Sequence, residues 1–235
     1  MENSLKKGLK DGIPIALGYI AVSFSFGIFA STSGVPVFIT VLISLANMTS
    51  AGQLAGLSVM LTHGSFFEIA LTQLIINLRY ALMSLSLSQK VDEKLGRGTR
   101  AAMSFAVTDE IFAVSSTKKG AVGRKYFAGL ACLPYFGWAG GTFLGAVAGN
   151  ILPDSVTSAL GIAIYGMFIA IFVPPAKKFK PVLKVVSLAI VLSCIFYWVP
   201  YLDSIPGGFA MIISTVLAAA FGAYFFPIKE DEDAE

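Results

Sequence analysis

A charged side chain and an amide side chain, Arg79 and Asn77, stand in the middle of the mostly apolar run Phe66–Leu87. An arginine at the centre of a membrane helix costs about 2.5–3.5 kcal/mol to insert, so it is kept only where it faces protein, water or a ligand. Its guanidinium can hold a carboxylate through two parallel hydrogen bonds. We therefore expect Arg79 either to bind a substrate carboxylate or to form a buried ion pair with Asp109 or Glu110.

Two adjacent carboxylates, Asp109 and Glu110, follow Thr108 in the centre of a second apolar segment, residues 101–117. At that depth they must be neutralised by protonation, by a cation or by Arg79. One interpretation is a site that recognises an ammonium group or takes up protons. The structural alternative is a charged turn at the boundary between membrane and water.

A third polar cluster, Asn47-Met-Thr-Ser-Ala-Gly-Gln53, interrupts the apolar run Val35–Leu61. Gly52 and its small neighbours make a helix break cheap. A broken helix exposes free N–H groups at one end and free carbonyls at the other, which suit a carboxylate and an ammonium. The alternative is a close helix contact, with Gln53 hydrogen-bonded across it. The candidate substrate-binding residues are thus Thr49, Ser50, Gly52, Gln53, Asn77, Arg79, Asp109 and Glu110.

The composition shows what kind of molecule positions these groups. Of the 235 residues, 56% are hydrophobic and only 13% are charged, with a mean hydropathy of +0.77. A soluble domain carries about 25% charged residues. The sequence therefore predicts an all-α polytopic membrane protein. Its net charge of +3 is small and its basic residues lie in short clusters between apolar runs, which excludes nucleic-acid binding and is typical of topology signals.

The apolar runs predict about seven transmembrane helices and one shorter segment. The second helix is expected to be broken, and the fifth to end at Pro174-Pro175. Residues 101–117 are flanked by basic residues and are at the lower length limit for a span, so we expect a short re-entrant or buried helix. Glu68 is expected to reach the membrane interface. The seven runs are 13–30, 35–61, 66–87, 126–149, 156–173, 182–199 and 207–226.

Glycine and proline positions recur weakly along the chain, in residues 12–87 and again in residues 126–200. With a re-entrant segment between them, these halves would point in opposite directions, as in the inverted repeats of many transporters. We expect one transmembrane transport domain over residues 1–228, followed by an acidic, disordered tail at 229–235.

Sequence motifs and side chains typical of enzyme active sites are scarce. The chain has no H-E-x-x-H, no G-x-S-x-G, no P-loop and no cluster of metal ligands. Its one histidine, His63, lies in a turn between apolar runs, and Cys132 and Cys194 both lie inside apolar runs. We therefore expect no enzymatic activity and no cofactor.

Several short motifs occur in one order and spacing: Gly12-Ile-Pro14, Phe26-Gly27, Ala51-Gly52-Gln53, Asn77-Leu-Arg-Tyr80 and Thr108-Asp-Glu110. In this, the chain resembles the AzlC-type family, the large subunit of branched-chain amino acid exporters. The resemblance covers essentially the whole chain and is strongest from Lys10 to Phe112.

The resemblance implies a secondary transporter that exports branched-chain amino acids across the inner membrane of a bacterial cell. It also implies a partner, a small AzlD-type membrane subunit. Because polar groups stand at depth in an otherwise apolar chain, we expect transport to be driven by a coupling ion or proton. Two other functions remain open at this point: a non-transporting scaffold or assembly subunit, and a passive channel for small solutes.

Overall fold

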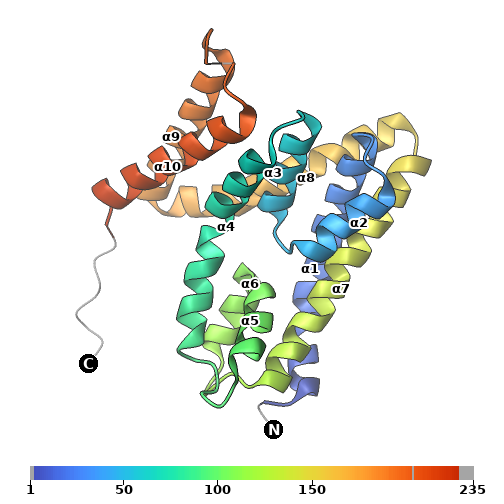
Figure 1. The fold of residues 1–235 in the computed structure, drawn as a ribbon, viewed down its shortest axis with the longest axis vertical. Coiled ribbons are helices and arrows are strands. Elements are labelled where there is room, and N and C mark those ends of the chain that lie inside the picture. The colour runs from blue at the N-terminus through green and yellow to red at the C-terminus, as the bar shows by residue number, and fades with distance from the viewer. Residues whose placement is uncertain (1–2, 203, 228–235) are drawn as a thin grey trace. The chain divides into compact units, whose positions relative to one another are not determined.

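The computed structural model describes residues 3–202 and 204–227, and this part of the chain is helical (Figure 1). Within it no β-strand forms, and one isolated bridge joins Val91 to Val122. The expected all-α fold is confirmed. The helices are α1 (Leu5–Thr32), α2 (Val37–Ala46), α3 (Ser50–Leu61), α4 (Phe66–Ser88), α5 (Arg97–Phe105), α6 (Asp109–Thr117), α7 (Arg124–Ile151), α8 (Asp154–Lys178), α9 (Lys180–Trp198) and α10 (Gly207–Phe225).

Among the residues placed, five helices are long and apolar enough to cross a membrane: α1, α4, α7, α9 and α10. The shorter apolar helices α2 and α3 together cover the second expected span. The chain is therefore a multi-pass membrane protein, while the total of seven spans stays a prediction.

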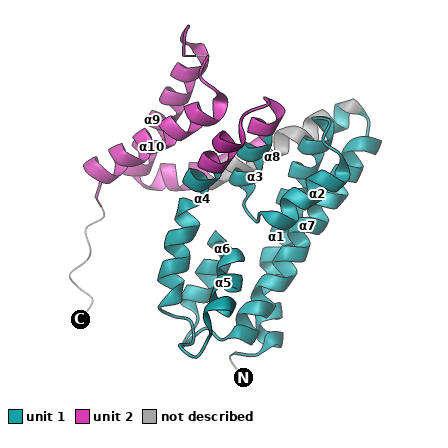
Figure 2. Cartoon of the chain, viewed as in Figure 1, with its two compact units in different colours: residues 1–57, 73–164 teal, residues 58–72, 165–235 magenta. Residues whose placement is uncertain are grey.

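The chain forms two compact units (Figure 2). The first contains residues 1–57 and 73–164, and the second contains residues 58–72 and 165–235. The single transport domain and the two repeat halves stay predictions. The expected disordered tail, residues 229–235, lies outside the described residues.

In the first unit, α1 and α7 pack along their whole length through glycines. A Cβ atom added at Gly8 would collide with the Tyr126 carbonyl oxygen, and one added at Gly145 would collide with that of Phe24. Small residues let membrane helices approach this closely, and van der Waals packing then holds them together. Early residues of α1 meet early residues of α7, so the two helices run parallel. This counts against an inverted relation between repeat halves that begin with these helices.

The apolar run of residues 35–61 is broken into two helices, as predicted, but the break lies before Gly52. Helix α2 ends at Ala46, and Asn47 is extended at φ −145° and ψ 113°. Gly52 instead lies in the first turn of α3, where its N–H donates to the Thr49 hydroxyl at 3.2 Å. The break falls at residues 47–49 because the Thr49 side chain caps the start of the new helix.

The segment 101–117 is not one helix, because residues 106–108 separate α5 from α6. Its two flanks lie together. The Asp92 N–H donates to the Val122 carbonyl at 3.1 Å, and the Val122 N–H donates to the Lys90 carbonyl at 2.9 Å. The chain thus leaves and returns at the same end of the first unit, which agrees with the re-entrant interpretation.

In the second unit, helices α9 and α10 pack on each other. Helix α8 does not end at Pro174-Pro175 but continues to Lys178, so this predicted boundary is wrong. Proline lacks an N–H but holds φ near the helical value, so a final turn can follow the pair. That turn is closed by the Phe179 N–H, which donates to the Pro175 carbonyl at 2.8 Å.

Glu68, in the first turn of α4, was expected to reach the membrane interface, and the structure instead buries it at 3% exposure. Its Oε1 accepts a hydrogen bond from the backbone N–H of Gly208 at 2.8 Å. Gly208 lies in the first turn of α10, where free N–H groups and the helix dipole attract a carboxylate.

Candidate substrate site between two helix breaks

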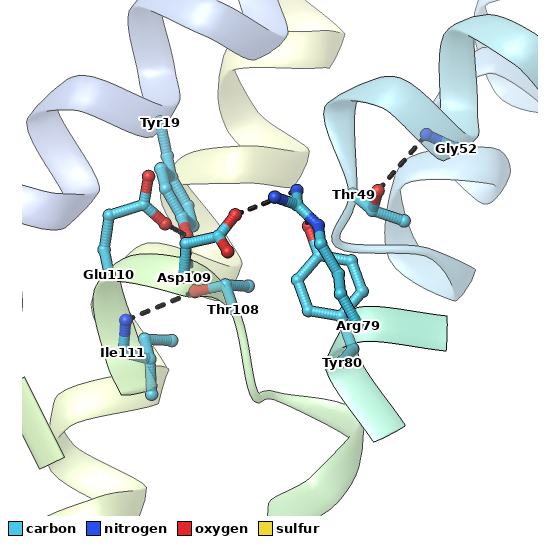
Figure 3. A network of polar contacts seen from close by, with 9 residues as sticks. All are labelled: Tyr19, Thr49, Gly52, Arg79, Tyr80, Thr108, Asp109, Glu110 and Ile111. Carbon is cyan, nitrogen blue, oxygen red and sulfur yellow. Dashed lines mark hydrogen bonds and ion pairs between the residues drawn. The ribbon is translucent and has the colours of Figure 1, made fainter. Parts of the chain in front are cut away.

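An ion pair joins α4 to α6 at the centre of the site. Arg79 Nη2 lies 2.9 Å from Asp109 Oδ2 (Figure 3). The sequence left Asp109 and Glu110 open as partners of Arg79, and the geometry selects Asp109. The two side chains are 53% and 46% exposed, so the pair is not sealed inside this chain. A ligand or a second subunit can therefore reach both charges.

Tyr80 holds the other side of the guanidinium. Its hydroxyl accepts a hydrogen bond from Arg79 Nη2 at 2.9 Å, and the guanidinium carbon lies 4.8 Å from the centre of the Tyr80 ring. A cation over an aromatic face is stabilised by the ring quadrupole. Tyr80 thereby orients Arg79 while leaving it charged.

The N-terminus of α6 explains why two acids stand side by side here. Thr108 is the N-cap residue, and its hydroxyl accepts from the Ile111 N–H at 3.3 Å. Asp109 and Glu110 form the first turn, where the helix dipole favours negative charge. The Thr-Asp-Glu motif thus both starts the helix and places the carboxylates at its positive end.

Tyr19 of α1 separates the two acids, and the sequence reasoning did not single it out. Its hydroxyl lies 2.5 Å from Glu110 Oε2 and 2.6 Å from Thr108 Oγ1. The ring is buried and packs edge-on against Trp138, with centroids 5.3 Å apart. Glu110 is therefore held toward α1, whereas Asp109 is directed toward Arg79 (Figure 3).

A cluster of carboxamides ties the α2–α3 break to α4. Gln73 Oε1 accepts from Asn47 Nδ2 at 3.1 Å and from Asn77 Nδ2 at 3.0 Å. Gln73 Nε2 donates to the Gly52 carbonyl at 2.7 Å. Asn77 thus contacts this cluster, two positions along the chain from Arg79. Gln73 was missed, although its position four residues before Asn77 places both on one face of α4.

Gln53 supports the structural alternative rather than a place in the site. It is 1% exposed, and its Nε2 donates to the Ser44 hydroxyl at 2.6 Å. Ser44 in turn lies 2.6 Å from the Thr142 hydroxyl of α7. Gln53 therefore joins α3 to α2 and, through Ser44, to α7.

The free carbonyls at the end of α2, expected to suit an ammonium, are occupied by α7. The Tyr135 hydroxyl donates to the Leu45 carbonyl at 3.0 Å, and Trp138 Nε1 donates to the Asn47 carbonyl at 3.2 Å. Asp109 is therefore the better acceptor for an ammonium group. On the other side of the break, Thr49 and Ser50 lie at the N-terminus of α3, which favours a carboxylate.

Long apolar helices, two interrupted segments and a charge pair between them define a polytopic membrane protein whose fold is consistent with membrane transport. The chain belongs to the AzlC family: the family model, described as AzlC protein, matches residues 14–152. The match includes both breaks, Tyr19 and the Arg79–Asp109 pair.

Relatives of the chain carry membrane-protein names. An uncharacterized membrane protein of Archaeoglobus fulgidus is 33% identical over 174 residues, which cover 73% of this chain and 76% of the relative. The inner membrane protein YgaZ of Escherichia coli is 29% identical over 171 residues, 70% of each chain. An uncharacterized membrane protein of Helicobacter pylori is 23% identical over 179 residues, 73% of this chain and 77% of the relative. No solved structure matches the chain.

Proposed function

We propose that this chain is the large subunit of a two-component exporter of branched-chain amino acids, a secondary transporter of the bacterial inner membrane. The observation that carries the proposal is the accessible ion pair between Arg79 and Asp109. An amino acid zwitterion bears the same two charges. When it binds, it can replace the Arg79–Asp109 ion pair by two new ion pairs, one between its carboxylate and Arg79 and one between its ammonium and Asp109.

The pair also gives the empty carrier a stable state. Charges that face an apolar membrane interior are costly when they are left unpaired. Arg79 and Asp109 neutralise each other when no substrate is bound. The empty protein can therefore return between its two orientations without carrying exposed charge through the membrane.

Other residues of the site have supporting roles in this proposal. Thr49 and Ser50 present the N-terminus of α3 to the substrate carboxylate. Gln73 and Asn77 hold the α2–α3 break in place, and Tyr19 keeps Glu110 from competing for Arg79.

The family resemblance suggests the partner, a small AzlD-type membrane subunit, and the charged groups placed within apolar segments favour coupling to an ion or proton gradient. The name of the Escherichia coli relative, inner membrane protein YgaZ, supports an inner-membrane location. Transport rather than catalysis is the activity we propose.

The test is efflux of labelled valine from vesicles that contain the chain with its partner. Wild-type protein should release valine faster than empty vesicles, and Arg79→Ala and Asp109→Asn should each bring release to that background. Arg97→Ala, an exposed change at the start of α5, serves as the matched control and should keep wild-type efflux. Equal efflux with and without wild-type protein would refute the proposed function.

The same experiment separates the two other functions. A scaffold predicts that Asp109→Asn weakens assembly with the partner while vesicles of either protein release valine at the background rate. A passive channel predicts efflux that ignores imposed proton or sodium gradients, with conductance measurable in a planar bilayer.

A further inference from the structure

Glu68 is a buried carboxylate outside the site described above, and it lies within the second unit. It is 3% exposed, and the Gly208 N–H donates to its Oε1 at 2.8 Å. The Glu68 N–H donates to the Ser65 hydroxyl at 3.1 Å, which fixes the start of α4. A buried carboxylate is costly unless a cation or several hydrogen bonds compensate it. In the part of the chain that is described, no lysine or arginine forms an ion pair with Glu68.

The surroundings of Glu68 are shaped to this side chain. A Cβ atom at Gly208 would meet three atoms of the Glu68 side chain, so the glycine leaves the space that the carboxylate occupies. The rings of Phe67 and Phe209 pack beside this contact at 6.5 Å. One turn along α4, the Thr72 hydroxyl is fully buried and has no partner among the placed residues. Glu68 thus sits in an apolar setting where its main compensation is the N-terminus of α10.

That arrangement makes the charge of Glu68 depend on one contact between two helices. While the first turn of α10 rests on the carboxylate, the Gly208 N–H and the helix dipole stabilise its negative charge. If α10 moves away without water entering, the carboxylate loses this compensation and must take up a proton.

We propose that Glu68 carries the coupling proton of the transport cycle, binding it when α10 separates from α4 and releasing it when the contact forms again. This inference rests on the proposed transport function and names the coupling ion and the residue that carries it. Intramembrane carboxylates of pumps and transporters perform proton relay in the same physical way.

Few other titratable groups lie on α3, on α10 or in the turn before α4. Helix α3 has none, and on α10 the only one is Tyr224, at its far end. His63, in the turn before α4, is exposed. Asp203, five positions before Gly208, lies outside the described residues.

The experiment uses Glu68→Gln, which keeps an oxygen to accept the Gly208 hydrogen bond but cannot exchange a proton. In vesicles with the partner, we expect the variant to lose valine efflux driven by a pH gradient. It should keep exchange of labelled for unlabelled valine, which needs no net proton movement. Glu93→Gln, a substitution at an exposed position in the α4–α5 loop, should keep both gradient-driven efflux and exchange. Gradient-driven efflux at the wild-type rate in Glu68→Gln would overturn the proposal.

A second measurement does not need transport. Infrared spectra of the purified protein, recorded across a pH series, should show the carbonyl band of a protonated buried carboxyl in wild type and in Glu93→Gln. The band should be missing in Glu68→Gln, and a band that persists in this variant would contradict the assignment. If the wild-type protein transports no valine but the infrared band behaves as expected, the proposed export of amino acids is refuted, whereas the assignment of Glu68 as a proton-binding residue is supported.

Discussion

At the scale of single residues, the two neighbouring acids of the site have different partners. Asp109 pairs with Arg79, whereas Glu110 is held by the hydroxyl of Tyr19. Without that hydroxyl, two carboxylates would compete for one guanidinium. Tyr19 therefore acts through Glu110 as a positioning residue, and it leaves Asp109 free to exchange Arg79 for a substrate.

Replacing Tyr19 by phenylalanine tests this division. The change removes the hydroxyl from the exposed Glu110 and from the buried Thr108, and a buried group left unsatisfied costs about 1–3 kcal/mol. We expect a lower melting temperature and a several-fold higher KM for valine, because Glu110 becomes a rival for Arg79. Efflux kinetics and thermal unfolding in detergent provide the measurements. Tyr197→Phe on the exposed face of α9 is the control. A Tyr19→Phe protein with the same KM and melting temperature as this control would contradict the positioning role of Tyr19.

How far the sequence leads can be seen from individual residues. An arginine in the middle of an apolar run needs a partner, and only Asp109 and Glu110 stand at similar depth, so the pair was predictable. Tyr19 was not, because its partner lies 91 positions away and a hydroxyl in an apolar run does not show where it points. Gln73 was hidden for the same reason, since its partner Asn47 becomes a neighbour only after the chain has folded back.

At the scale of helices, one side chain, Gln73, joins the break between α2 and α3 to α4. Gln73 bonds Asn47 in the break, the Gly52 carbonyl in the first turn of α3, and Asn77 on its own helix. The sequence indicated a break but suggested Gly52 as its position. The Thr49 cap decides the position instead, because a capping hydroxyl defines where a helix begins more sharply than a flexible glycine does.

Substituting Gln73 by leucine should loosen this break. Three polar groups would lose a partner, at a cost of about 1–3 kcal/mol for each group that stays unsatisfied. We expect a clearly lower unfolding temperature in detergent, together with reduced efflux. Gln89→Leu, the same change at an exposed position after α4, should have little effect. Unfolding temperatures that agree between the two variants would argue against the role of Gln73.

The parallel packing of α1 and α7 gives a second test at this scale. A methyl group at Gly145 would strike the backbone of Phe24, whereas one at Gly140 meets nothing within 4 Å. Overpacking a close contact costs about 1–3 kcal/mol. Gly145→Ala should therefore destabilise the protein, while Gly140→Ala should be neutral or slightly stabilising because alanine favours helix. Unfolding by denaturant in micelles measures both, and equal stabilities would contradict the close contact.

At the scale of the whole molecule, the segment from α5 to α6 enters and returns at one end of the first unit. The hydrogen bonds between residues 90–92 and Val122 fix this arrangement. The positive-inside rule favours the cytoplasmic side for both flanks, since both are rich in lysine and arginine. Re-entrant backbone at this depth is stable only against protein, which agrees with the contacts of α6 to α1 and α7.

Single cysteines at positions 93 and 119 test this topology in a protein in which Cys132 and Cys194 are replaced by alanine. A membrane-impermeant thiol reagent should label both positions from the same side of the membrane. We expect labelling in inverted vesicles and protection in intact cells. Reaction of the two positions from opposite sides would show that the segment crosses the membrane.

The most direct measurement of the central claim is equilibrium binding of leucine and two analogues to the purified two-subunit complex. Leucine carries both charges, 4-methylpentanoate lacks the ammonium, and 3-methylbutylamine lacks the carboxylate. If the substrate inserts between Arg79 and Asp109, wild type should prefer leucine to both analogues. Asp109→Asn should then weaken the binding of leucine but not that of 4-methylpentanoate. Arg79→Ala should weaken the binding of leucine but not that of 3-methylbutylamine. Variants that bind all three compounds as wild type does would contradict the account.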